Sequence, residues 1–331
     1  MQSLKDKKIL FFDGSGNAYH KGIITAFETL GAKVTPLVYG NFMNDTKMNR
    51  LKKMFRLKKI CFKDNDFLDA ISGDFDILFI KNPERGNKRI FIELRKRYPN
   101  IPFINYNWNS INHVDYREYI PLFDKVFSFD PVDAKKYNLE YYPLFYLPEF
   151  EKIGIDQKKD YGISFVGSGF TPGRAEFMTK FFDIVSAKKI SVFLHLYAYS
   201  WKEFVTGKFI KNYNFKKSVS LSFLPHEKLL EIYKKSLAFV DHPMSIQNGH
   251  TIRTFETLAS GLLLISTNKG LKNEPFYDPA RIHIIEEDAS DLNIDFVTAY
   301  KPSFPSNFEK YRIDNWLQYI LKDTVRKQEL F

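Results

Sequence analysis

Residues 238–268 read AFVDHPMSIQNGHTIRTFETLASGLLLISTN, in which two apolar runs flank a polar loop and a helical segment. The first run ends at Asp241, and the second begins at Leu262. Thr251 can cap the start of the helix, and Gly261 suits the left-handed conformation just past its end. Two buried strands joined through one helix form a βαβ unit. The loop after the first strand then lies where open α/β sheets bind ligands.

This helix has two different faces. Phe255, Leu258 and Ala259 form an apolar stripe at helical spacing, which indicates the side that packs on the core. Arg253 and Glu256 lie three residues apart on another side, so both can reach one ligand. A cation near a helix N-terminus opposes the helix dipole unless an anion is bound there. The alternative is a surface ion pair between these two residues.

The order of a strand, the pattern HPxxxQxG, the pattern TxRxFExLAxG and a second apolar strand resembles the donor-binding half of GT-B glycosyltransferases. It is most similar to the CgeB-like enzymes of bacterial capsule, O-antigen and exopolysaccharide synthesis. The resemblance implies that Glu256 binds the nucleotide ribose, and that the loop and helix start surround the diphosphate and sugar. The donor-binding residues implied here are His242, Gln247, Gly249, His250, Thr251, Arg253 and Glu256. Many sugar-nucleotide transferases carry a second glutamate, which residues 244–247 lack, so retaining and inverting outcomes both stay open.

The bulk composition predicts a folded chain with two domains. The chain has 331 residues, of which 44% are hydrophobic and 17% aromatic, enough for two cores of ordinary size. The single cysteine, Cys61, excludes an internal disulfide and fits a reducing cytoplasm. No segment approaches the roughly 18 apolar residues that span a bilayer, and no N-terminal signal is visible. We therefore expect a soluble, cytoplasmic protein.

The formal net charge of +10 is concentrated in residues 47–63, which contain eight Lys or Arg and no acidic residue. Met48, Leu51 and Met54 recur at helical spacing between the basic residues. This pattern is typical of a basic amphipathic helix on an anionic membrane surface. A solvated helix packed on its own domain is the alternative. We expect no nucleic-acid partner, because no recognised nucleic-acid motif accompanies the charge.

A strand pattern over 8–12, a Gly-rich turn and a helix pattern over 20–30 open the chain. This order is typical of a Rossmann-like half, although the turn is not a full GxGxxG. In GT-B enzymes the corresponding turn faces the interdomain cleft and helps hold the acceptor. The acceptor-binding residues implied in this turn are Gly14, Ser15 and Gly16. Asp13 and His20 are the candidate general bases for the attacking hydroxyl; turn capping and a plain helix-start role are the alternatives.

Three further strand patterns end in polar or aromatic residues. They cover 76–80, 102–106 and 125–129. Loops after parallel strands gather at one edge of a sheet, so these ends should converge. Trp108, Asn109 and Asp130 are therefore candidate acceptor contacts, with plain packing as the alternative for Trp108. Residues 119–146 also resemble the CgeB-like family, so the likeness extends into the first domain.

Prolines and charges over 143–160 mark the expected crossover between the domains. A strand pattern then runs into a Gly-rich turn that begins at Gly167 and precedes a helix. Backbone N–H groups at such a helix start can bind an anion, and Arg174 can pair with a diphosphate. We therefore expect Gly167, Ser168 and Arg174 in the donor site. A strand pattern over 219–224 is followed by a helix pattern over 226–235. The resemblance implies that Leu224, at this corner, contacts the nucleotide base; a role in packing alone is the alternative.

These observations predict an α/β chain of GT-B architecture, with two Rossmann-like domains facing each other across a cleft. The expected boundaries are 1–150 for the acceptor domain, 151–305 for the donor domain and 306–331 for a C-terminal helix that crosses back to the first domain. The expected activity is transfer of a sugar from a UDP-linked donor to a saccharide hydroxyl in bacterial surface polysaccharide synthesis. Domain closure would exclude the water that hydrolyses the donor.

No metal and no cofactor beyond the nucleotide-sugar are expected. No Cys or His cluster has zinc-ligand spacing, and no Asp-x-Asp lies in a setting that suggests a metal-held diphosphate. With a lipid-linked acceptor, the protein would work peripherally on the inner face of the cytoplasmic membrane. His242-Pro243 with Asp13-Gly14 leaves open a transferase that uses a CMP-linked acidic sugar. A non-catalytic scaffold that binds a nucleotide-sugar, and nucleic-acid binding through 47–63, also stay open.

Overall fold

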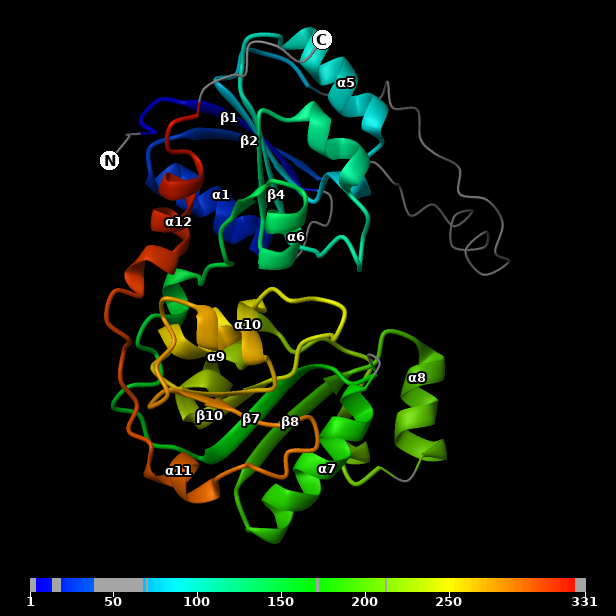
Figure 1. The fold of residues 1–331 in the computed structure, drawn as a ribbon, viewed down its shortest axis with the longest axis vertical. Helices are drawn as coiled ribbons and strands as arrows, with labels where there is room; N and C mark the ends of the chain where they lie inside the picture. Colours follow the sequence, from blue (N-terminus) through cyan, green and yellow to red (C-terminus); the bar gives the residue numbers. More distant parts are fainter. Residues whose placement is uncertain are drawn as a thin grey trace. The chain divides into compact units, whose positions relative to one another are not determined.

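The computed structural model describes residues 4–13, 19–38, 68–69, 71–170, 173–211 and 213–324. The chain divides into two compact units, the first formed by Met1–Pro143 with Ile313–Phe331 and the second by Leu144–Arg312. Each unit contains a six-stranded sheet with helices on both of its faces (Figure 1). Two groups of residues named from the sequence lie outside the described residues. They are Gly14 to Gly16 and the basic segment 47–63, which contains Cys61.

The sheet of the first unit is entirely parallel and has the order β2-β1-β3-β4-β5-β6. Its strands are β1 (Lys8–Asp13), β2 (Lys33–Val38), β3 (Ile77–Lys81), β4 (Phe103–Asn107), β5 (Lys125–Ser128) and β6 (Glu140–Tyr141). The helices described in this unit are α1 (Tyr19–Thr29), η1 (Pro83–Arg85), α5 (Lys88–Arg97), η2 (Arg117–Leu122), α6 (Pro131–Lys136) and α12 (Ile313–Ile320). The direction in which strands are added reverses between β1 and β3. Open sheets bind ligands beside the carboxyl ends of such strands.

The strands of the first unit are apolar on both faces because helices cover both. Phe11 and Phe79 pack with Phe27 of α1 on one face, at ring distances of 6.2 and 5.6 Å. Leu10 and Phe12, the alternate residues of β1, join the core beneath α5 on the other face. Continuous apolar runs such as 9–12 are the signature of parallel strands covered on both sides.

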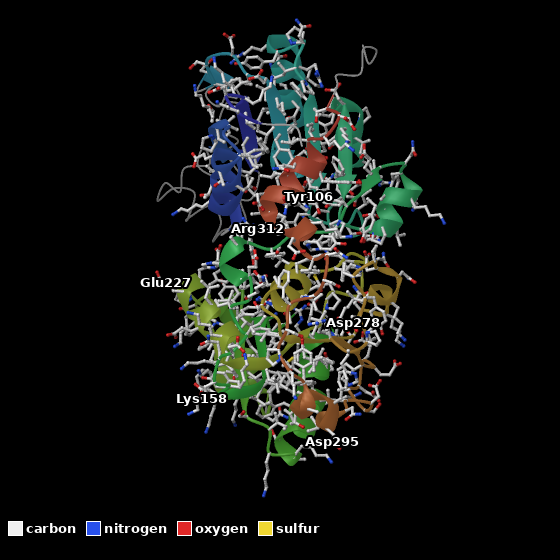
Figure 2. All side chains as sticks on the ribbon, turned by 90° about the vertical axis from the view of Figure 1, so that its left-hand side faces the viewer. Tyr106, Lys158, Glu227, Asp278, Asp295 and Arg312 are labelled. Atoms are coloured by element: carbon white, nitrogen blue, oxygen red, sulfur yellow. The ribbon has the colours of Figure 1, made fainter. Side chains whose placement is uncertain are left out.

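Helix α12 belongs to the first unit although it comes near the end of the chain. The Trp316 ring meets the Tyr106 ring edge-on at 4.6 Å, and Trp316 Nε1 donates a hydrogen bond to the Pro143 carbonyl at 2.8 Å. Tyr106 lies on the sheet beside this helix (Figure 2). The described part of the segment 306–331, where a C-terminal helix is expected, forms a 3-10 turn, η7 (Glu309–Tyr311), followed by α12 over Ile313–Ile320.

The sheet of the second unit is also parallel, with the order β12-β11-β10-β7-β8-β9. Its strands are β7 (Tyr161–Ser168), β8 (Val192–Tyr197), β9 (Val219–Ser220), β10 (Ser236–Asp241), β11 (Leu263–Ser266) and β12 (Ile282–Ile284). The helices described in this unit are η3 (Pro148–Phe150), α7 (Arg174–Ala187), α8 (Trp201–Val205), η4 (Thr206–Ile210), η5 (Lys216–Ser218), α9 (His226–Lys235), α10 (Ile252–Ala259), η6 (Lys269–Asn273), α11 (Ile294–Ala299) and η7 (Glu309–Tyr311). The first strand of the unit, β7, lies beside the fourth, β10, which is the Rossmann arrangement. The strand order therefore reverses between β7 and β10.

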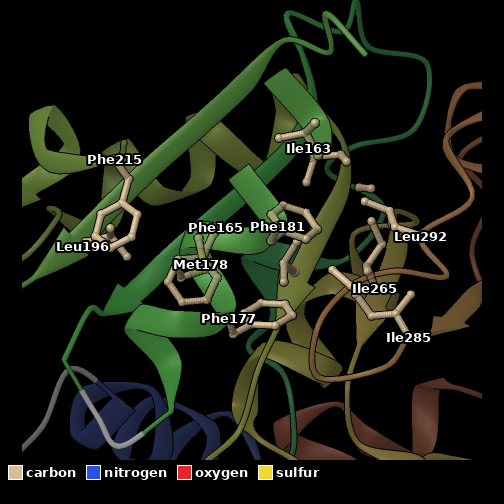
Figure 3. Packing of buried hydrophobic residues seen from close by; sticks show 14 of the residues in the cluster. Ile163, Phe165, Phe177, Met178, Phe181, Leu196, Phe215, Ile265, Ile285 and Leu292 are labelled. Carbon is tan, nitrogen blue, oxygen red and sulfur yellow. The ribbon is translucent and has the colours of Figure 1, made fainter. Parts of the chain in front are cut away.

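Helices α7 and α11 cover one face of this sheet. Phe177 and Phe181 of α7 share a core with inward residues of the sheet (Figure 3). Val297 of α11 and residues of β7, β10 and β11 belong to the same core. Helices α9 and α10 cover the opposite face, where the ring of Tyr233 stacks on Phe239 of β10 at 4.2 Å. The charged side chains on the outer surface of the unit, such as Lys158 and Asp295, are exposed (Figure 2).

Strand β9 is shorter than the sequence predicts. A strand was expected over 219–224, but β9 covers only Val219–Ser220. The Ser220 hydroxyl accepts a hydrogen bond from the Ser222 amide at 3.0 Å, and this local turn ends the strand. Helix α10 follows the prediction closely, because Thr251 caps its start and Gly261 takes a φ of +79° beyond its end.

Candidate functional site

Two arginines cross at the point where the sheet of the second unit reverses. Arg174 begins α7, the helix after β7, and its Nη2 donates to the carbonyl of His242, just beyond β10. Arg253 lies in the first turn of α10, and its Nη2 donates to the carbonyl of Val166 in β7 at 3.0 Å. Arg174, which follows β7, thus bonds to the loop after β10, and Arg253, which follows that loop, bonds to β7. Both guanidinium groups are held at the carboxyl edge of the sheet.

Arg174 is also fixed from its own side. Its Nη1 donates to the carbonyl and the hydroxyl of Ser168, both at 3.0 Å. Its Nε is buried and has no hydrogen-bond partner among the residues that the structure describes. An unsatisfied buried N–H costs about 1–3 kcal/mol, which an anionic ligand could relieve. Burial lowers the pKa of Arg174, but the guanidinium stays charged because its usual pKa lies far above neutral pH.

Glu256 is completely buried, whereas the side chain of Arg253 keeps 16% of its surface exposed. The Glu256 carboxylate accepts hydrogen bonds from Arg253 Nη1 at 2.8 Å and from the Tyr233 hydroxyl at 3.0 Å. Arg253 Nη1 also donates to the Tyr233 oxygen at 2.9 Å. The three side chains form one network. Within it, the arginine is the member that reaches the surface.

Asp241, the last residue of β10, anchors the start of α10. Its Oδ2 accepts hydrogen bonds from the hydroxyls of Thr251 and Thr254, both at 2.9 Å. Thr251 in turn caps the helix by accepting from the Arg253 amide at 3.1 Å. Burial raises the pKa of Asp241, and the two hydroxyls oppose that rise. The result is a helix N-terminus whose first turn, with Arg253, is rigidly placed.

The two histidines of the 242–250 loop are enclosed by other side chains. The His242 ring lies flat on Phe177, with centroids 4.2 Å apart, and its Nδ1 is 3.0 Å from the Thr267 hydroxyl. Burial and the nearby Arg174 charge lower the pKa of His242 to about 4. His250 Nε2 lies 2.9 Å from a Glu274 carboxylate oxygen. The contacts of both rings therefore hold the 242–250 loop against the rest of the unit.

The remaining donor-site candidates occupy the same edge or the next corner. Gly167 is close to the Phe165 ring, and an added Cβ there would lie 3.1 Å from it. Gln247 is partly buried and Gly249 is buried. The backbone N–H of Gln247 donates to the Met244 carbonyl at 3.0 Å, which closes a turn in the loop. Leu224 is partly buried and precedes the N-cap residue of α9.

The first unit brings Asp13 and His20 together. His20 Nδ1 lies 3.0 Å from Asp13 Oδ2, at the start of α1. The same Asp13 oxygen accepts a hydrogen bond from Lys81 Nζ at 2.9 Å, and both of these side chains are buried. Burial lowers the pKa of Lys81, and the Asp13 charge opposes that effect. This cluster lies at the ends of β1 and β3, where the order of the first sheet reverses.

The three acceptor-contact candidates, Trp108, Asn109 and Asp130, have different surroundings. Trp108 is near the cluster, because Lys81 Nζ lies 4.6 Å from its ring and Tyr19 packs against it at 5.4 Å. Asn109 donates to Glu84 at 3.2 Å. Asp130 is buried and caps α6, where its carboxylate accepts from the Val132 amide at 2.9 Å. The Asp130 carboxylate therefore stabilises the N-terminus of α6.

Sequence reasoning missed four residues that complete these clusters. They are Lys81, Tyr233, Asp241 and Thr254. Two of them carried a usable signal, since Lys81 and Asp241 are charged residues at the ends of apolar strands. Tyr233 reads as an ordinary apolar-face residue of α9, and only the fold brings it to Glu256.

The sequence matches no protein-family model and no curated protein. Solved structures with a similar fold include the lipopolysaccharide outer core galactosyltransferase WaaB, with a TM-score of 0.55 and 11% identity over 95% of this chain and 99% of that one. A UDP-forming α,α-trehalose-phosphate synthase from Burkholderia vietnamiensis gives a TM-score of 0.53, with 12% identity over 96% and 97%. The chain has the GT-B fold. A glycosyltransferase from Rickettsia africae shares this GT-B fold with a TM-score of 0.52 and 11% identity, over 97% and 94%.

Metal-binding clusters and membrane-spanning helices are both absent from the residues that the structure describes. Within that part of the chain, no group of three or more His, Cys, Asp or Glu side chains could hold a metal ion. Every helix described there is too short or too polar to cross a membrane.

Proposed function

We propose that this protein is a glycosyltransferase that moves a sugar from a UDP-linked donor to a saccharide hydroxyl. The observation that carries the proposal is the crossed pair Arg174 and Arg253 at the switch point of the second sheet. Two guanidinium groups and the N-termini of α7 and α10 meet there. This is the chemistry that a diphosphate requires, because it carries negative charge on several oxygens.

The donor would bind along the carboxyl edge of the second unit. Arg174 and Arg253 would hold the diphosphate, with Ser168 and the 242–251 loop around the diphosphate and the sugar. Glu256 is the proposed ribose ligand. Because its carboxylate already accepts from Arg253 and Tyr233, a ribose hydroxyl would have to share that oxygen or use the other one. Leu224 is the proposed contact for the base.

The same two arginines would neutralise the leaving diphosphate, and we propose that the reaction needs no metal ion. Departure of the nucleoside diphosphate leaves two negative charges on the terminal phosphate. Fixed cations stabilise this developing charge without rearranging during the reaction. This role differs from plain donor binding, because it predicts a loss of kcat when either guanidinium is removed.

Asp13 and His20 are the proposed catalytic pair of the first unit. The acceptor hydroxyl would transfer its proton to His20 Nε2, while Asp13 at Nδ1 orients the ring and stabilises the imidazolium that forms. The hydroxyl oxygen would then form the new bond to the sugar carbon as the diphosphate leaves. Lys81 is a positioning residue in this scheme, since its ammonium favours the ionised form of Asp13.

The biological setting of the proposal is bacterial surface polysaccharide synthesis by a CgeB-like enzyme at the cytoplasmic face of the membrane. Its support is the sequence resemblance, which covers the 238–268 region and residues 119–146. The acceptor would be a saccharide, free or lipid-linked.

The proposal is tested by thermal unfolding of the intact protein with UDP, GDP, dTDP, CMP and their common sugar conjugates. A ligand that binds only the folded state raises Tm, by an amount equivalent to about 2.7 kcal/mol at a hundred times Kd. We expect a rise with UDP and UDP-sugars. A rise with CMP alone would favour the acidic-sugar transferase, and no rise with any nucleotide would contradict the proposal.

The ribose assignment has its own test. We expect the 2′-deoxy and 3′-deoxy analogues of UDP to bind the native protein more weakly than UDP does. In Glu256→Gln that difference should shrink, because the partner of the missing hydroxyl has changed. If Glu256→Gln weakens UDP and both analogues equally, Glu256 acts only by holding Arg253, and the ribose role is wrong.

A further inference from the structure

The surface around α8 exposes large apolar side chains that the rest of the described chain does not cover. Five of them define what we call the α8 surface. They are Tyr199, Trp201, Phe209, Ile210 and Phe223, each between 65% and 71% exposed. Single exposed apolar residues are ordinary, but five within one short region of a domain mark an interaction surface. Helix α8 lies at the periphery of the second unit (Figure 1).

This exposure is not a failure of the segment to pack. Phe204, within α8, packs against the core of the unit, and Phe215 after η4 is buried in it. Gly207 lies in contact with the Phe170 ring, so that no side chain would fit between them. The segment is therefore anchored to the unit through Phe204 and Gly207. The rings of Trp201 and Phe209 lie beside the Phe204 ring, at 5.4 and 6.1 Å, and stay largely exposed.

The same region is strongly basic. Residues 199–217 contain five lysines and one acidic residue. The lysines are Lys202, Lys208, Lys211, Lys216 and Lys217. The acid, Glu203, already accepts a hydrogen bond from the Tyr199 amide at 2.8 Å. Lys202, Lys211, Lys216 and Lys217 are exposed, whereas Lys208 is partly buried, with its Nζ 5.3 Å from the Phe204 ring.

We propose that the α8 surface docks the second unit on a bilayer that contains anionic lipids. Tryptophan and tyrosine favour the headgroup level of a membrane, and phenylalanine and isoleucine can enter the acyl boundary below it. Lysines around them are attracted by anionic headgroups, each contributing within a Debye length of the surface. Ile210 has no flat face on which a nucleic-acid base could stack, which favours lipid over RNA as the partner.

This inference uses only residues of the second unit and does not depend on the proposed transferase activity. It also differs from a membrane contact through the basic segment 47–63. The two sites are separated in the experiment because Trp201 reports on the α8 surface alone. Of the three tryptophans, Trp316 is buried and Trp108 is partly buried, whereas Trp201 is 67% exposed.

The first measurement is tryptophan emission of the full-length protein with phosphatidylcholine vesicles, alone or containing phosphatidylglycerol. We expect a blue shift only with the anionic vesicles, because the Trp201 ring leaves water when it binds. Trp201→Phe keeps an apolar ring and should still sediment with the vesicles, but without the shift. An unchanged emission spectrum in native protein that does sediment would assign binding to another surface and overturn the proposal.

The second measurement is sedimentation of charge variants with the anionic vesicles. We expect Lys202→Gln, Lys211→Gln and Lys217→Gln together to reduce the partition coefficient by roughly tenfold or more, since each lost cation removes a separate attraction. The matched control is Lys158→Gln, Lys188→Gln and Lys234→Gln, which removes the same charge from exposed sites elsewhere in the unit. Equal binding of the two triple variants would overturn the proposal. So would tight, salt-dependent retention on RNA without vesicle binding.

Discussion

Lys81 and Asp13 form a buried ion pair across neighbouring parallel strands, with 2.9 Å between the ammonium nitrogen and the carboxylate oxygen. The register of the sheet places the two residues opposite each other, at the last position of β1 and β3. The carboxylate also contacts His20, so one oxygen holds a lysine and a histidine together. The pair therefore links the integrity of the first sheet to the geometry of the candidate base.

We expect Lys81→Met to destabilise the first unit by about 3 kcal/mol or more, because it leaves the Asp13 carboxylate buried without its cation. Urea unfolding followed by circular dichroism measures this change. Lys7→Met is the control, since Lys7 pairs with Asp76 at 3.0 Å on the surface, where such pairs contribute about 1 kcal/mol or less. Equal losses in the two variants would show that Asp13 is not held as an ion in the folded protein.

His20→Gln should lower kcat by about 10²- to 10⁴-fold, the usual contribution of a general base, if the protein is a glycosyltransferase. The KM for the donor should change little, because His20 lies in the first unit and the donor-site candidates lie in the second. Initial rates with radiolabelled UDP-sugar measure both constants. A variant with native kcat would remove His20 from the mechanism and leave Asp13 as the candidate.

Arg174→Met and Arg253→Met should each weaken UDP binding by about 10- to 100-fold, because a charged hydrogen bond contributes about 1.5–3 kcal/mol. Isothermal titration calorimetry measures the affinity. The control is Arg281→Met, an arginine of the same unit that precedes β12 at the opposite edge of the sheet and bonds Asp278 at 3.1 Å. If Arg281→Met weakens binding as much as the other two, the loss reflects general damage to the unit.

The low pKa of His242 predicts a pH dependence of stability. In the folded protein this pKa is about 4, whereas it is 6.5 for an unperturbed histidine. Between these values the unfolded chain binds the extra proton, so stability falls as pH decreases from 6.5 to 4. The expected loss is on the order of 3 kcal/mol. Urea unfolding at several pH values should show this part of the slope disappearing in His242→Gln; an identical slope would mean that His242 charges freely in the fold.

Trp316→Ala should destabilise the first unit by about 3–5 kcal/mol, because it empties a large site between α12 and the sheet and removes the hydrogen bond to Pro143. Gln318→Ala, at a partly buried position of the same helix, should change the free energy of unfolding by less than about 0.5 kcal/mol. Thermal unfolding compares them. Similar Tm values would mean that α12 contributes little to the unit.

Much of the fold follows from local patterns. The unbroken apolar run over 9–12 predicts a strand covered on both faces, and the pair Thr251 and Gly261 predicts both ends of α10. These features depend on neighbouring residues alone. The α8 and η4 helices could not be predicted in the same way, because the segment has aromatic residues on both sides and no clear helical stripe.

The composition of the candidate sites was less predictable because it depends on strand order. Asp13 and Lys81 are 68 residues apart, and only the pairing of β1 with β3 brings them together. Arg174 reaches the loop after β10 only because β10 lies next to β7. Glu256 was named from the sequence as a donor ligand, which stays a prediction, and its contact with Tyr233 depends on how α9 and α10 pack on one sheet face.

The discontinuous first unit has a consequence for how the protein is made. Translation delivers residues 1–143 first, then the whole of Leu144–Arg312, and only afterwards the helix that carries Trp316. The second unit can therefore fold on the ribosome before α12 has been synthesised. Until then, the sheet face that carries Tyr106 stays exposed to water. A chain stalled before Ile313 would present that aromatic face to chaperones and proteases. The first unit can therefore be completed only after the second unit has been synthesised.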